Sequence, residues 1–311
     1  MRYPRISVII PTYNGDTWIA ETIESVIKQT FQDFEIIVVD DGSPTPVARF
    51  LDFDPRIHIV RQENAGTSAA RNLALTNAKG EFVAFLDHDD LWTPEKLQRQ
   101  VDLFSNHPEI GFVFCDYESF GSEALRPNGF LRGTLNKVAA VEVDPEVFLI
   151  KESNLFKWLL KDLFVQIPST WMIRRQLLLD SGGFNPALRR GTEDWHLALR
   201  LSERCHFAFH RRTMVKRREF PQSLSATSNS DEEMLRALNL LCNTEELSPG
   251  SHQIAFEMRR EFARNLARLD FKAGHYKESR EKISIALERC ALSNPATWKD
   301  IYISLRSLAK T

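Results

Sequence analysis

Three aspartates and a histidine fill the positions from Asp87 to Asp90, immediately after an apolar run that begins at Phe82. Carboxylates this close repel one another and resist burial unless a cation or hydrogen-bond donors compensate their charge. Their oxygens are also the ligands that Mg²⁺ and Mn²⁺ prefer. If extended backbone continues across His88, Asp87 and Asp89 point to the same side and can share one ion. An N-cap for the following helix needs only one aspartate, so the cluster favours metal binding or catalysis over capping.

Other residues able to bind a ligand follow apolar runs nearer the start of the chain. They are Pro11, Thr12, Tyr13, Asn14, Asp40 and Asp41, joined by Arg71 in a later predicted helix. The chain contains neither GxGxxG nor GxxxxGK[ST], so neither a dinucleotide fold nor a P-loop is indicated. A nucleotide diphosphate would therefore need a divalent cation, which Asp87 and Asp89 could hold.

The side chains suggest a role for several of these residues. Asp40 could accept hydrogen bonds from a base or ribose, Tyr13 could stack on the base, and Arg71 offers a fork of donors to a carbonyl or phosphate. Each has a structural alternative. Asp40 and Asp41 could shape a turn with Gly42. Tyr13 could pack within its loop, and Arg71 could lie exposed on its helix. Taken singly, the residue types favour these alternatives.

The elements that would position these residues alternate between strand and helix. Strands are predicted at 6–10, 34–39, 57–60, 82–86 and 110–115, and helices at 18–29, 69–78 and 94–104. This alternation predicts an α/β fold with a mixed, mostly parallel sheet and right-handed crossovers. Parallel sheets bind ligands at the carboxyl ends of their strands, and the motifs described above all lie there.

The rest of this region is less regular in sequence. We interpret 117–166 as an insertion beside the site, where a second substrate or a partner could be selected. A return strand is predicted at 168–174, followed by a helix that a glycine turn closes. Glu193 and Asp194 open the next helix, where the helix dipole favours acidic residues without any function.

The pattern of residue types changes near residue 226, where a polar segment begins. Beyond it, apolar residues recur at steps of three and four, as in Ala255, Met258, Phe262, Leu266 and Leu269. That period is typical of helices that bury one face. We therefore predict two domains, an α/β domain at 1–225 and a helical domain at 226–311.

The composition is that of an ordinary soluble protein, with 40 basic and 42 acidic side chains among 311 residues. This balance gives no reason to expect nucleic acid as a partner, although a basic stretch from Arg211 could form a phosphate patch. No apolar run suits a transmembrane helix, and the start is unlike a signal peptide. Four scattered cysteines favour free thiols. We expect a cytoplasmic protein, with a place at the inner face of the membrane, peripheral membrane contact and oligomerisation left open.

The order of the motifs along the chain strengthens the functional interpretation of each one. PTYN follows the first predicted strand, DDGS the second, NAGTSAARN opens a helix, LDHDD follows a later strand, and GGFN and TEDWHLALRL come last. Over about residues 6–225, this succession closely resembles the family-2 glycosyltransferases, which have the GT-A fold. The resemblance implies an inverting transferase of polysaccharide, glycolipid or other glycan synthesis. It also implies a nucleotide-sugar donor, most often a UDP-sugar, a divalent metal (Mn²⁺ or Mg²⁺), and a glycan, glycolipid or other hydroxyl acceptor.

The same resemblance implies roles for individual residues. The nucleotide-sugar would be bound by Pro11, Thr12, Tyr13, Asn14, Asp40, Asp41, Arg71, Asp87 and His88. Asp87 and Asp89, which form a DxD pattern, would hold the metal. Asp194 would be the general base, with Glu193 as its less favoured substitute. In an inverting displacement a carboxylate takes the acceptor's proton on one side, while a cation stabilises the departing charge on the other. The helix dipole would lower the pKa of Asp194, so burial would have to raise it.

One segment departs from the family's pattern. Many relatives carry a segment like HPGSLS where this chain has FPQSLS, so Phe220 stands at the usual histidine position and cannot bind metal or phosphate. We expect Arg217 and Arg218 to face the diphosphate instead. Compensation by Glu219, or weaker metal binding, is the alternative.

Two other functions stay open. A nucleotidyltransferase also uses a carboxylate-bound metal and a nucleotide, although its glycine-rich signature loop is missing here. Outside the enzymes, the chain could be a catalytically silent module that binds a nucleotide-sugar or a partner, with the helical tail as its interacting part. Turnover of a donor would distinguish an enzyme from such a module.

Overall fold

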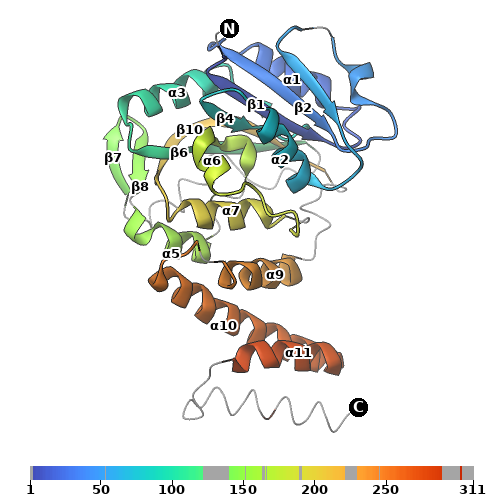
Figure 1. Cartoon of the computed structure of the whole chain (residues 1–311), viewed down its shortest axis with the longest axis vertical. Helices are drawn as coiled ribbons and strands as arrows, with labels where there is room; N and C mark the ends of the chain where they lie inside the picture. Colours follow the sequence, from blue (N-terminus) through green and yellow to red (C-terminus); the bar gives the residue numbers. More distant parts are fainter. Residues whose placement is uncertain are drawn as a thin grey trace. The chain divides into compact units, whose positions relative to one another are not determined.

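A computed structural model describes residues 3–52, 54–121, 140–150, 152–162, 165, 167–188, 191–220, 230–244, 246–288 and 302. The chain divides into two compact units, Met1–Ser228 and Asn229–Thr311. The first unit contains a mixed sheet with helices on both faces, and the second is helical (Figure 1). The predicted α/β class with a helical C-terminal segment is therefore confirmed.

Four strands build the parallel half of the sheet. They are β1 (Ile6–Thr12), β2 (Phe34–Asp40), β3 (Ile57–Arg61) and β4 (Phe82–Phe85). β1 pairs in parallel with β2 and β4, and β2 pairs in parallel with β3. β1, β2 and β4 are buried along their whole length, as expected for strands that are covered on both faces. Their carboxyl ends meet at one edge, where Thr12 stands opposite Asp40.

The other half of the sheet is mixed. Its strands are β5 (Leu91–Trp92), β6 (Ile110–Gly121), β7 (Ala140–Asp144), β8 (Val147–Ile150), β9 (Met172–Arg174) and β10 (His206–Glu219). The order is β3-β2-β1-β4-β9-β6-β10-β8-β7, with β5 paired to β10 outside it. β9 lies antiparallel between β4 and β6, whereas β6 and β10 are parallel.

In this half, one sequence prediction needs correction and one strand was not predicted. The return strand predicted at 168–174 is divided, because a 3₁₀ helix, η2 (Pro168–Thr170), precedes β9. The basic stretch from Arg211 belongs to β10, which the sequence did not predict because its charged residues hide any apolar pattern. Several of those charges are paired, as in Arg212 with Glu95 at 3.5 Å and Lys216 with Glu118 at 3.8 Å.

The region interpreted as an insertion, 117–166, is largely regular where the structure describes it. Its first residues continue β6, the β7–β8 hairpin occupies 140–150, and α5 (Glu152–Asp162) follows. Residues 122–139 of this region lie outside the described residues. Selection of an acceptor or partner by this region stays a prediction.

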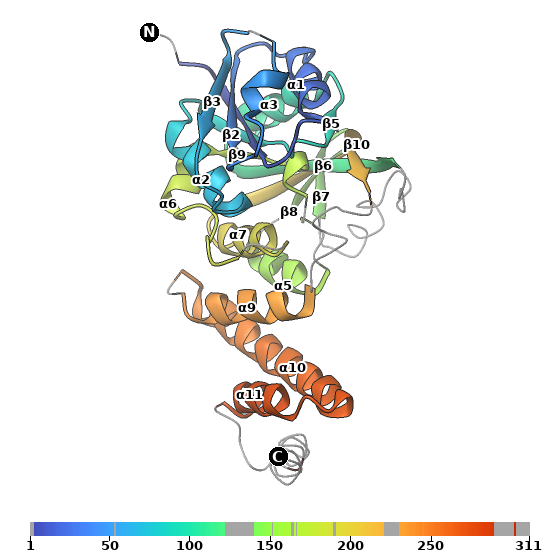
Figure 2. The same ribbon diagram turned by 90° about the vertical axis from the view of Figure 1, so that its right-hand side faces the viewer.

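Helices cover both faces of the sheet (Figures 1 and 2). α1 (Ile19–Ile27) and α3 (Lys96–Asn106) lie side by side on one face, where the Gln29 side chain accepts a hydrogen bond from Leu97 N at 3.0 Å. The other face carries α2 (Thr67–Asn77), α6 (Arg175–Asp180) and α7 (Glu193–Leu201). The Asn72 side chain on α2 exchanges hydrogen bonds with the main chain of Phe184, whose ring packs edge-on against Phe85 in β4. These contacts fix the segment before α7 beside α2 and the end of β4.

A lysine is fully buried at the start of α3. Lys96 is 0% exposed, its ammonium donates to Gln100 Oε1 at 2.8 Å, and it lies 4.0 Å from the centroid of the Trp92 ring. Within the described part of the chain, no carboxylate pairs with it. Burial lowers the pKa of Lys96 to about 7, because the charged form loses its hydration.

This lysine should make the stability of the protein depend on pH. The unfolded chain binds a proton at Lys96 up to about pH 10.5, whereas the folded chain releases it near pH 7. The free energy of unfolding should therefore rise with pH across this window. We expect Lys96→Met to remove roughly 2–4 kcal/mol of that rise, at about 1.4 kcal/mol per pKa unit. Urea denaturation between pH 6 and pH 10 measures it, with the exposed Lys28→Met as the control. Parallel curves for Lys96→Met and the parent would contradict the assignment.

The second unit is a helical bundle. It contains α9 (Ser230–Cys242), α10 (Pro249–Ala273) and α11 (Tyr276–Leu287). Leu235, Ala263 and Leu266 form its core, which agrees with the predicted stripe on α10. Leu269 is an exception, since it is 57% exposed. α10 ends at Gly274, whose φ of +87° is accessible to glycine without strain.

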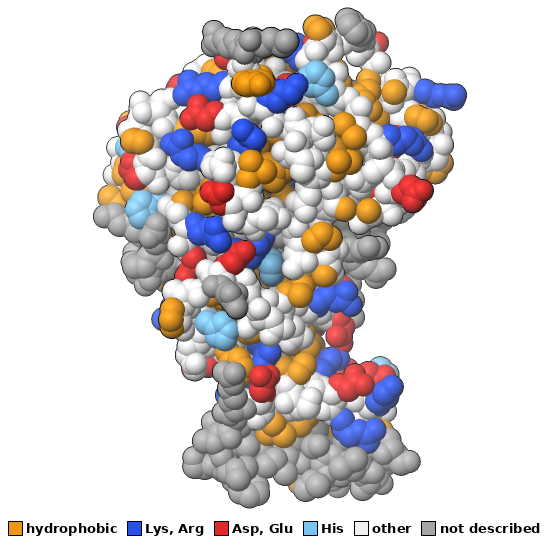
Figure 3. Space-filling view, in the orientation of Figure 1, with side chains coloured by type: hydrophobic (Ala, Val, Ile, Leu, Met, Phe, Trp, Pro, Cys, Tyr) orange, Lys and Arg blue, Asp and Glu red, His pale blue; other side chains and the backbone are white. Residues whose placement is uncertain are grey.

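The surface over the sheet unit is mixed in charge. On the face shown in Figure 3, blue and red side chains are interspersed among apolar and neutral ones. That pattern agrees with the balanced composition. Among the described helices, none combines the length and apolarity that a membrane crossing needs.

Candidate active site

The turn that follows β4 holds the aspartate cluster and is anchored from two sides. The Thr22 hydroxyl on α1 lies 2.8 Å from His88 O and 3.0 Å from Asp90 O. On the other side, the Ser169 hydroxyl of η2 accepts from Asp87 N at 3.1 Å and donates to Asp90 Oδ2 at 2.6 Å. The main chain of the turn is thereby held between a helix and the return segment of the sheet.

The aspartates do not cap the next helix. α3 has Glu95 as its N-cap, and no described side chain caps it. Asp90 is 3% exposed and accepts hydrogen bonds from Ser169 and from Arg218 N. Burial, then the charges of Asp89 and Asp87, raise the pKa of Asp90 well above its ordinary value. The capping alternative is therefore wrong, and Asp90 supports the turn from within.

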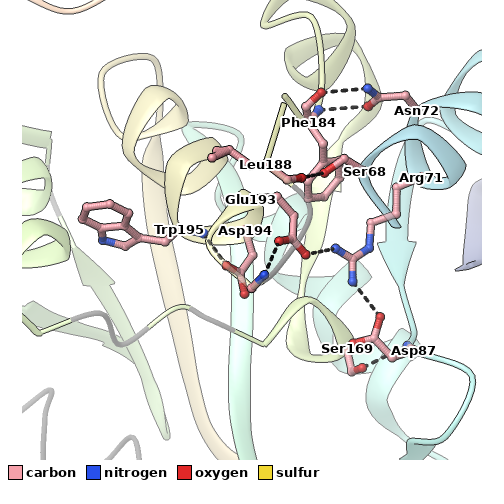
Figure 4. Close-up of polar contacts among 11 residues, drawn as sticks. Ser68, Arg71, Asn72, Asp87, Ser169, Phe184, Leu188, Glu193, Asp194 and Trp195 are labelled. Atoms are coloured by element: carbon pink, nitrogen blue, oxygen red, sulfur yellow. Dashed lines mark hydrogen bonds and ion pairs between the residues drawn. The ribbon is translucent and has the colours of Figure 1, made fainter. Parts of the chain in front are cut away.

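One guanidinium joins the two acidic motifs (Figure 4). Arg71 on α2 donates from Nη2 to Asp87 Oδ1 at 2.7 Å and from Nη1 to Glu193 Oε1 at 3.1 Å. Its side chain is only 3% exposed, and its guanidinium lies 5.1 Å from the centroid of the Phe184 ring. Burial opposes the charge, but Asp87 and Glu193 outweigh it and raise the pKa of Arg71. The exposed-helix alternative for Arg71 is therefore wrong, and the residue bridges the turn after β4 and the start of α7.

The two acids at the start of α7 use their oxygens differently. Glu193 accepts from Arg71 through one oxygen and from Gly191 N at 3.0 Å through the other. Asp194 accepts from Trp195 N. Burial, then the charge of Glu193, raise the pKa of Asp194 well above its ordinary value, so burial outweighs the helix dipole. A carboxyl with a raised pKa is the better proton acceptor near neutral pH. The assignment of Asp194 as the base, with Glu193 as its substitute, stays a prediction.

Asp87 and Asp89 offer carboxylate oxygens suited to a hard cation. Both side chains belong to half-buried residues. Burial raises the pKa of Asp89, and the charge of Asp87 acts in the same direction. A cation would relieve this repulsion. Among the described residues, no group of three or more His, Cys, Asp or Glu side chains could hold a metal. Mg²⁺, however, is commonly bound by one or two carboxylates together with substrate phosphates, so the pair fits an ion that is shared with a diphosphate.

The loops after β1 and β2 are linked and border a small cavity. Asn14, with a φ of 52°, donates from N to Ser43 Oγ at 3.1 Å. Tyr13 is 46% exposed, whereas Pro11 and Thr12 are buried within β1. The cavity has a volume of about 120 Å³ and is lined by Asn14, Gly15, Asp16, Ser43, Pro44, Thr45, Val47 and Phe50. Tyr13 is therefore the one of the four PTYN residues with a ring accessible to a ligand.

Asp40 and Asp41 organise the loop after β2. Asp40 is 1% exposed and accepts from Ser43 N at 2.8 Å and Arg61 Nη1 at 2.6 Å. Burial alone would raise the pKa of Asp40, but the hydrogen bonds and the charge of Arg61 hold it below its ordinary value. Asp41 accepts from two main-chain N–H groups just before α2. Asp40 has the turn-shaping role considered from the sequence, whereas Asp41 holds the segment before α2, and direct contact of either with a nucleotide stays a prediction.

His88 lies against the loop after β1. A Cβ at Gly15 would stand 2.9 Å from the His88 ring and 2.2 Å from Thr12 Oγ1, so this close approach requires glycine. His88 also acts on its neighbour, because its charge lowers the pKa of Asp89. His88 thus connects the loop after β1 with the turn after β4. Both segments contain residues of the predicted nucleotide-sugar site.

The segment that departs from the family's pattern contacts the aspartate turn, and the expectation that Arg217 and Arg218 face a diphosphate stays a prediction. Arg218 donates from Nε to Asp89 O at 3.0 Å and from Nη2 to Glu21 at 2.7 Å, so it braces the turn. Phe220 packs against Trp18, with ring centroids 4.6 Å apart. Arg217 lies close enough to lower the pKa of Asp89, and its contact with a diphosphate stays a prediction. Residues 221–225 lie outside the described residues.

Three residues of the site were not identified from the sequence. Asp90 was part of the cluster, but strand alternation does not explain its inward direction, because residues 88 and 89 form a turn in which Asp90 N donates to Asp87 O at 3.1 Å. Thr22 and Ser169 gave no signal, because they are 66 and 82 positions away from the residues they contact. Only the fold brings them to the turn.

Comparison with known proteins finds a family and relatives that this chain resembles. Residues 7–182 match the family described as Glycosyl transferase family 2. One relative is WfgD of Escherichia coli, described as a UDP-Glc:alpha-D-GlcNAc-diphosphoundecaprenol beta-1,3-glucosyltransferase, which is 38% identical over 123 residues. Another is an uncharacterized glycosyltransferase of Haemophilus influenzae, which is 35% identical over 127 residues. The matches cover 39% and 38% of this chain and 48% and 51% of the relatives, so the chain spans about half of their length.

Solved structures share the fold. S. aureus TarS 1-349 in complex with UDP-GlcNAc matches with a TM-score of 0.65 and 20% identity, over 97% of this chain and 89% of that one. The mannosyltransferase PcManGT from Pyrobaculum calidifontis, in complex with GDP-Man and Mn²⁺, gives a TM-score of 0.53 and 18% identity, over 99% of this chain and 81% of that one. At this identity the likeness concerns architecture, and it confirms the predicted GT-A fold.

Proposed function

The chain belongs to glycosyltransferase family 2, and we propose that it transfers a sugar from a nucleotide-diphosphate donor to an acceptor hydroxyl with inversion. The observation that carries the proposal is the Arg71 bridge, which holds Asp87 and Glu193 on a single guanidinium. This bridge brings the turn after β4, suited to a donor's diphosphate, next to the start of α7, where a buried acid is suited to accept a proton. A UDP-sugar is the donor we expect, because TarS is known with UDP-GlcNAc and the name of WfgD specifies UDP-Glc.

The donor's nucleotide would lie over the loops after β1 and β2. Tyr13 has the exposed ring that can stack on a base, and the cavity beside Ser43 lies next to it. Asp87 and Asp89 would hold a divalent cation, Mn²⁺ or Mg²⁺, together with the diphosphate. When bound, this ion would offset the negative charge that develops on the departing diphosphate. Arg217 lies near enough for its positive charge to lower the pKa of Asp89.

Transfer would be a single displacement at the anomeric carbon. Asp194 takes the proton of the acceptor hydroxyl, and the acceptor oxygen forms the new bond to the anomeric carbon. The bond from that carbon to the diphosphate oxygen breaks, and its electron pair leaves with the nucleotide diphosphate. The burial that raises the pKa of Asp194 also excludes water from it. Glu193, fixed by Arg71 and Gly191, orients the start of α7.

We further propose that the acceptor is a glycan or a glycolipid. The printed name of WfgD specifies a sugar carried on diphosphoundecaprenol, which supports a lipid-linked acceptor for this chain as well. With such an acceptor, the chain would act at the cytoplasmic face of a membrane.

Donor hydrolysis tests this function without knowledge of the acceptor. The protein is incubated with a panel of UDP- and GDP-sugars with Mn²⁺, and release of the nucleoside diphosphate is measured. We expect slow release from one UDP-sugar, and its loss in EDTA, because water can replace the acceptor in the same displacement. Consumption of added pyrophosphate, with formation of a nucleoside triphosphate and the sugar 1-phosphate, would instead identify a nucleotidyltransferase. Tight binding of a nucleotide-sugar without turnover, with acceptor extracts present, would support the silent module and contradict the proposal.

A further inference from the structure

A single buried hydroxyl ties together both ends of the aspartate turn. Ser169 is 0% exposed, so no ligand can reach its side chain. Its Oγ accepts from Asp87 N at 3.1 Å and donates to Asp90 Oδ2 at 2.6 Å. The two partners lie at the first and last positions of the turn. The hydroxyl therefore fixes the span of the segment from which Asp87 and Asp89 project.

The element that carries Ser169 is itself held in place. Trp92 Nε1 donates to Ser169 O at 2.8 Å, and the Gln100 side chain donates to Thr170 O at 2.9 Å. η2 then leads directly into β9, which pairs with β4, the strand that the turn follows. The position of Ser169 is thus set by the sheet and by α3, independently of the turn that it holds.

The turn needs such support because its charges oppose one another. Asp90 is 3% exposed and lies in the same four-residue turn as Asp87 and Asp89, so three carboxyl groups are held close together. Arg218 N and Ser169 supply the hydrogen bonds that stabilise the Asp90 carboxyl in this position. Among the described residues, Ser169 is the donor to Asp90 Oδ2, so loss of its hydroxyl would leave that buried oxygen without a hydrogen bond. The turn could then relax and change the spacing of the two outer carboxylates.

We propose that Ser169 is a positioning residue for donor binding, which acts through Asp87 N and Asp90 to set the geometry of the Asp87 and Asp89 carboxylates. The inference rests on the proposed function, in which these two carboxylates share a cation with the donor's diphosphate. Ser169 touches neither substrate nor cation. Its contribution is comparable to that of outer-shell partners of metal ligands, whose substitution costs about 10–100-fold in metal affinity.

The experiment compares UDP binding by calorimetry in Mn²⁺ and in EDTA, for the parent and for Ser169→Ala. We expect the variant to bind UDP at least about 10-fold more weakly in Mn²⁺ and almost unchanged in EDTA. Ser202→Ala is the matched control, since its hydroxyl is also buried but bonds only to Leu199 O within its own helix region. Ser169→Cys, which keeps a weak donor of similar size, should fall between parent and alanine, and it carries the test if Ser169→Ala does not fold.

Amide hydrogen exchange of the peptide covering 86–92 provides a second measurement that needs no ligand. We expect faster exchange of this peptide in Ser169→Ala and no change in Ser202→Ala. Unchanged exchange, or equal weakening of UDP binding in Mn²⁺ and EDTA, would refute the positioning role of Ser169 alone. Absence of any Mn²⁺ effect on UDP binding by the parent would instead refute the metal-assisted donor site, and with it this inference.

Discussion

Asp194→Asn is expected to bind a nucleotide-sugar as well as the parent and to lose transfer, with kcat lowered about 10²–10⁴-fold. The amide keeps the size of the side chain and can still accept the hydrogen bond from Trp195 N. It has no basic oxygen able to take the proton of an acceptor hydroxyl. KM for the donor should therefore change little, because donor binding does not use the lost group.

The pH dependence of transfer gives this test a second measure. Burial and the charge of Glu193 raise the pKa of Asp194, and a base works only when deprotonated. The parent's kcat should therefore fall on the acidic side at a pH above the ordinary aspartate pKa of 3.8. The residual activity of Asp194→Asn should not show this fall of kcat at acidic pH. Asp180→Asn, an exposed acid on α6 that accepts from Gln176, is the control. Equal kcat in Asp194→Asn and the parent would eliminate Asp194 as the base.

Arg71→Met should destabilise the fold by about 3–5 kcal/mol, because it leaves two buried or partly buried carboxylates without their counter-charge. The side chains of Arg71 and Glu193 are 3% and 7% exposed, and that of Asp87 is 33% exposed. Methionine retains most of the contact with Phe184 but neutralises neither acid. The deficit should narrow at acidic pH, where the carboxylates can take up protons.

Urea denaturation at pH 5 and pH 7.5 measures this loss. Arg99→Met provides a matched control, because Arg99 forms an i,i+4 pair with Glu95 whose side chains are 34% and 49% exposed. Pairs of that kind contribute about 0–1 kcal/mol. A loss for Arg71→Met no greater than that for Arg99→Met would mean that the bridge does not hold the two motifs together.

The parts of the fold that the sequence predicted are those with a local cause. β1, β2 and β4 are continuous apolar runs, and such runs are typical of strands buried on both faces. The helix over Ile19, Ile23 and Val26 follows from the spacing of its buried residues. Because the carboxyl ends of parallel strands share an edge, the motifs after β1, β2 and β4 could be placed together before any coordinates were known.

The parts that could not be predicted depend on contacts between distant segments. Arg71 reads as a helix residue, and only the fold brings it to Glu193, 122 positions away. Ser169 lies in a stretch that reads as a strand, whereas η2 turns its hydroxyl toward the aspartates. The strand β10 could not be recognised from the sequence because its many charged residues hide the strand pattern. Their partners lie on distant segments, as Glu21 on α1 does for Arg218. Phe220 could be recognised as a departure from the family's pattern, but not as a partner of Trp18.

The shared guanidinium of Arg71 has an evolutionary consequence. One positive charge serves two acids that belong to separate motifs, so the electrical balance of the centre is a property of three positions at once. A substitution at one acid leaves the positive charge of Arg71 paired with the other acid alone. A substitution at Arg71 leaves both acids without their counter-charge. Viable sequence drift at these positions must therefore proceed by concerted replacement, and across many descendants the three should form a covarying set.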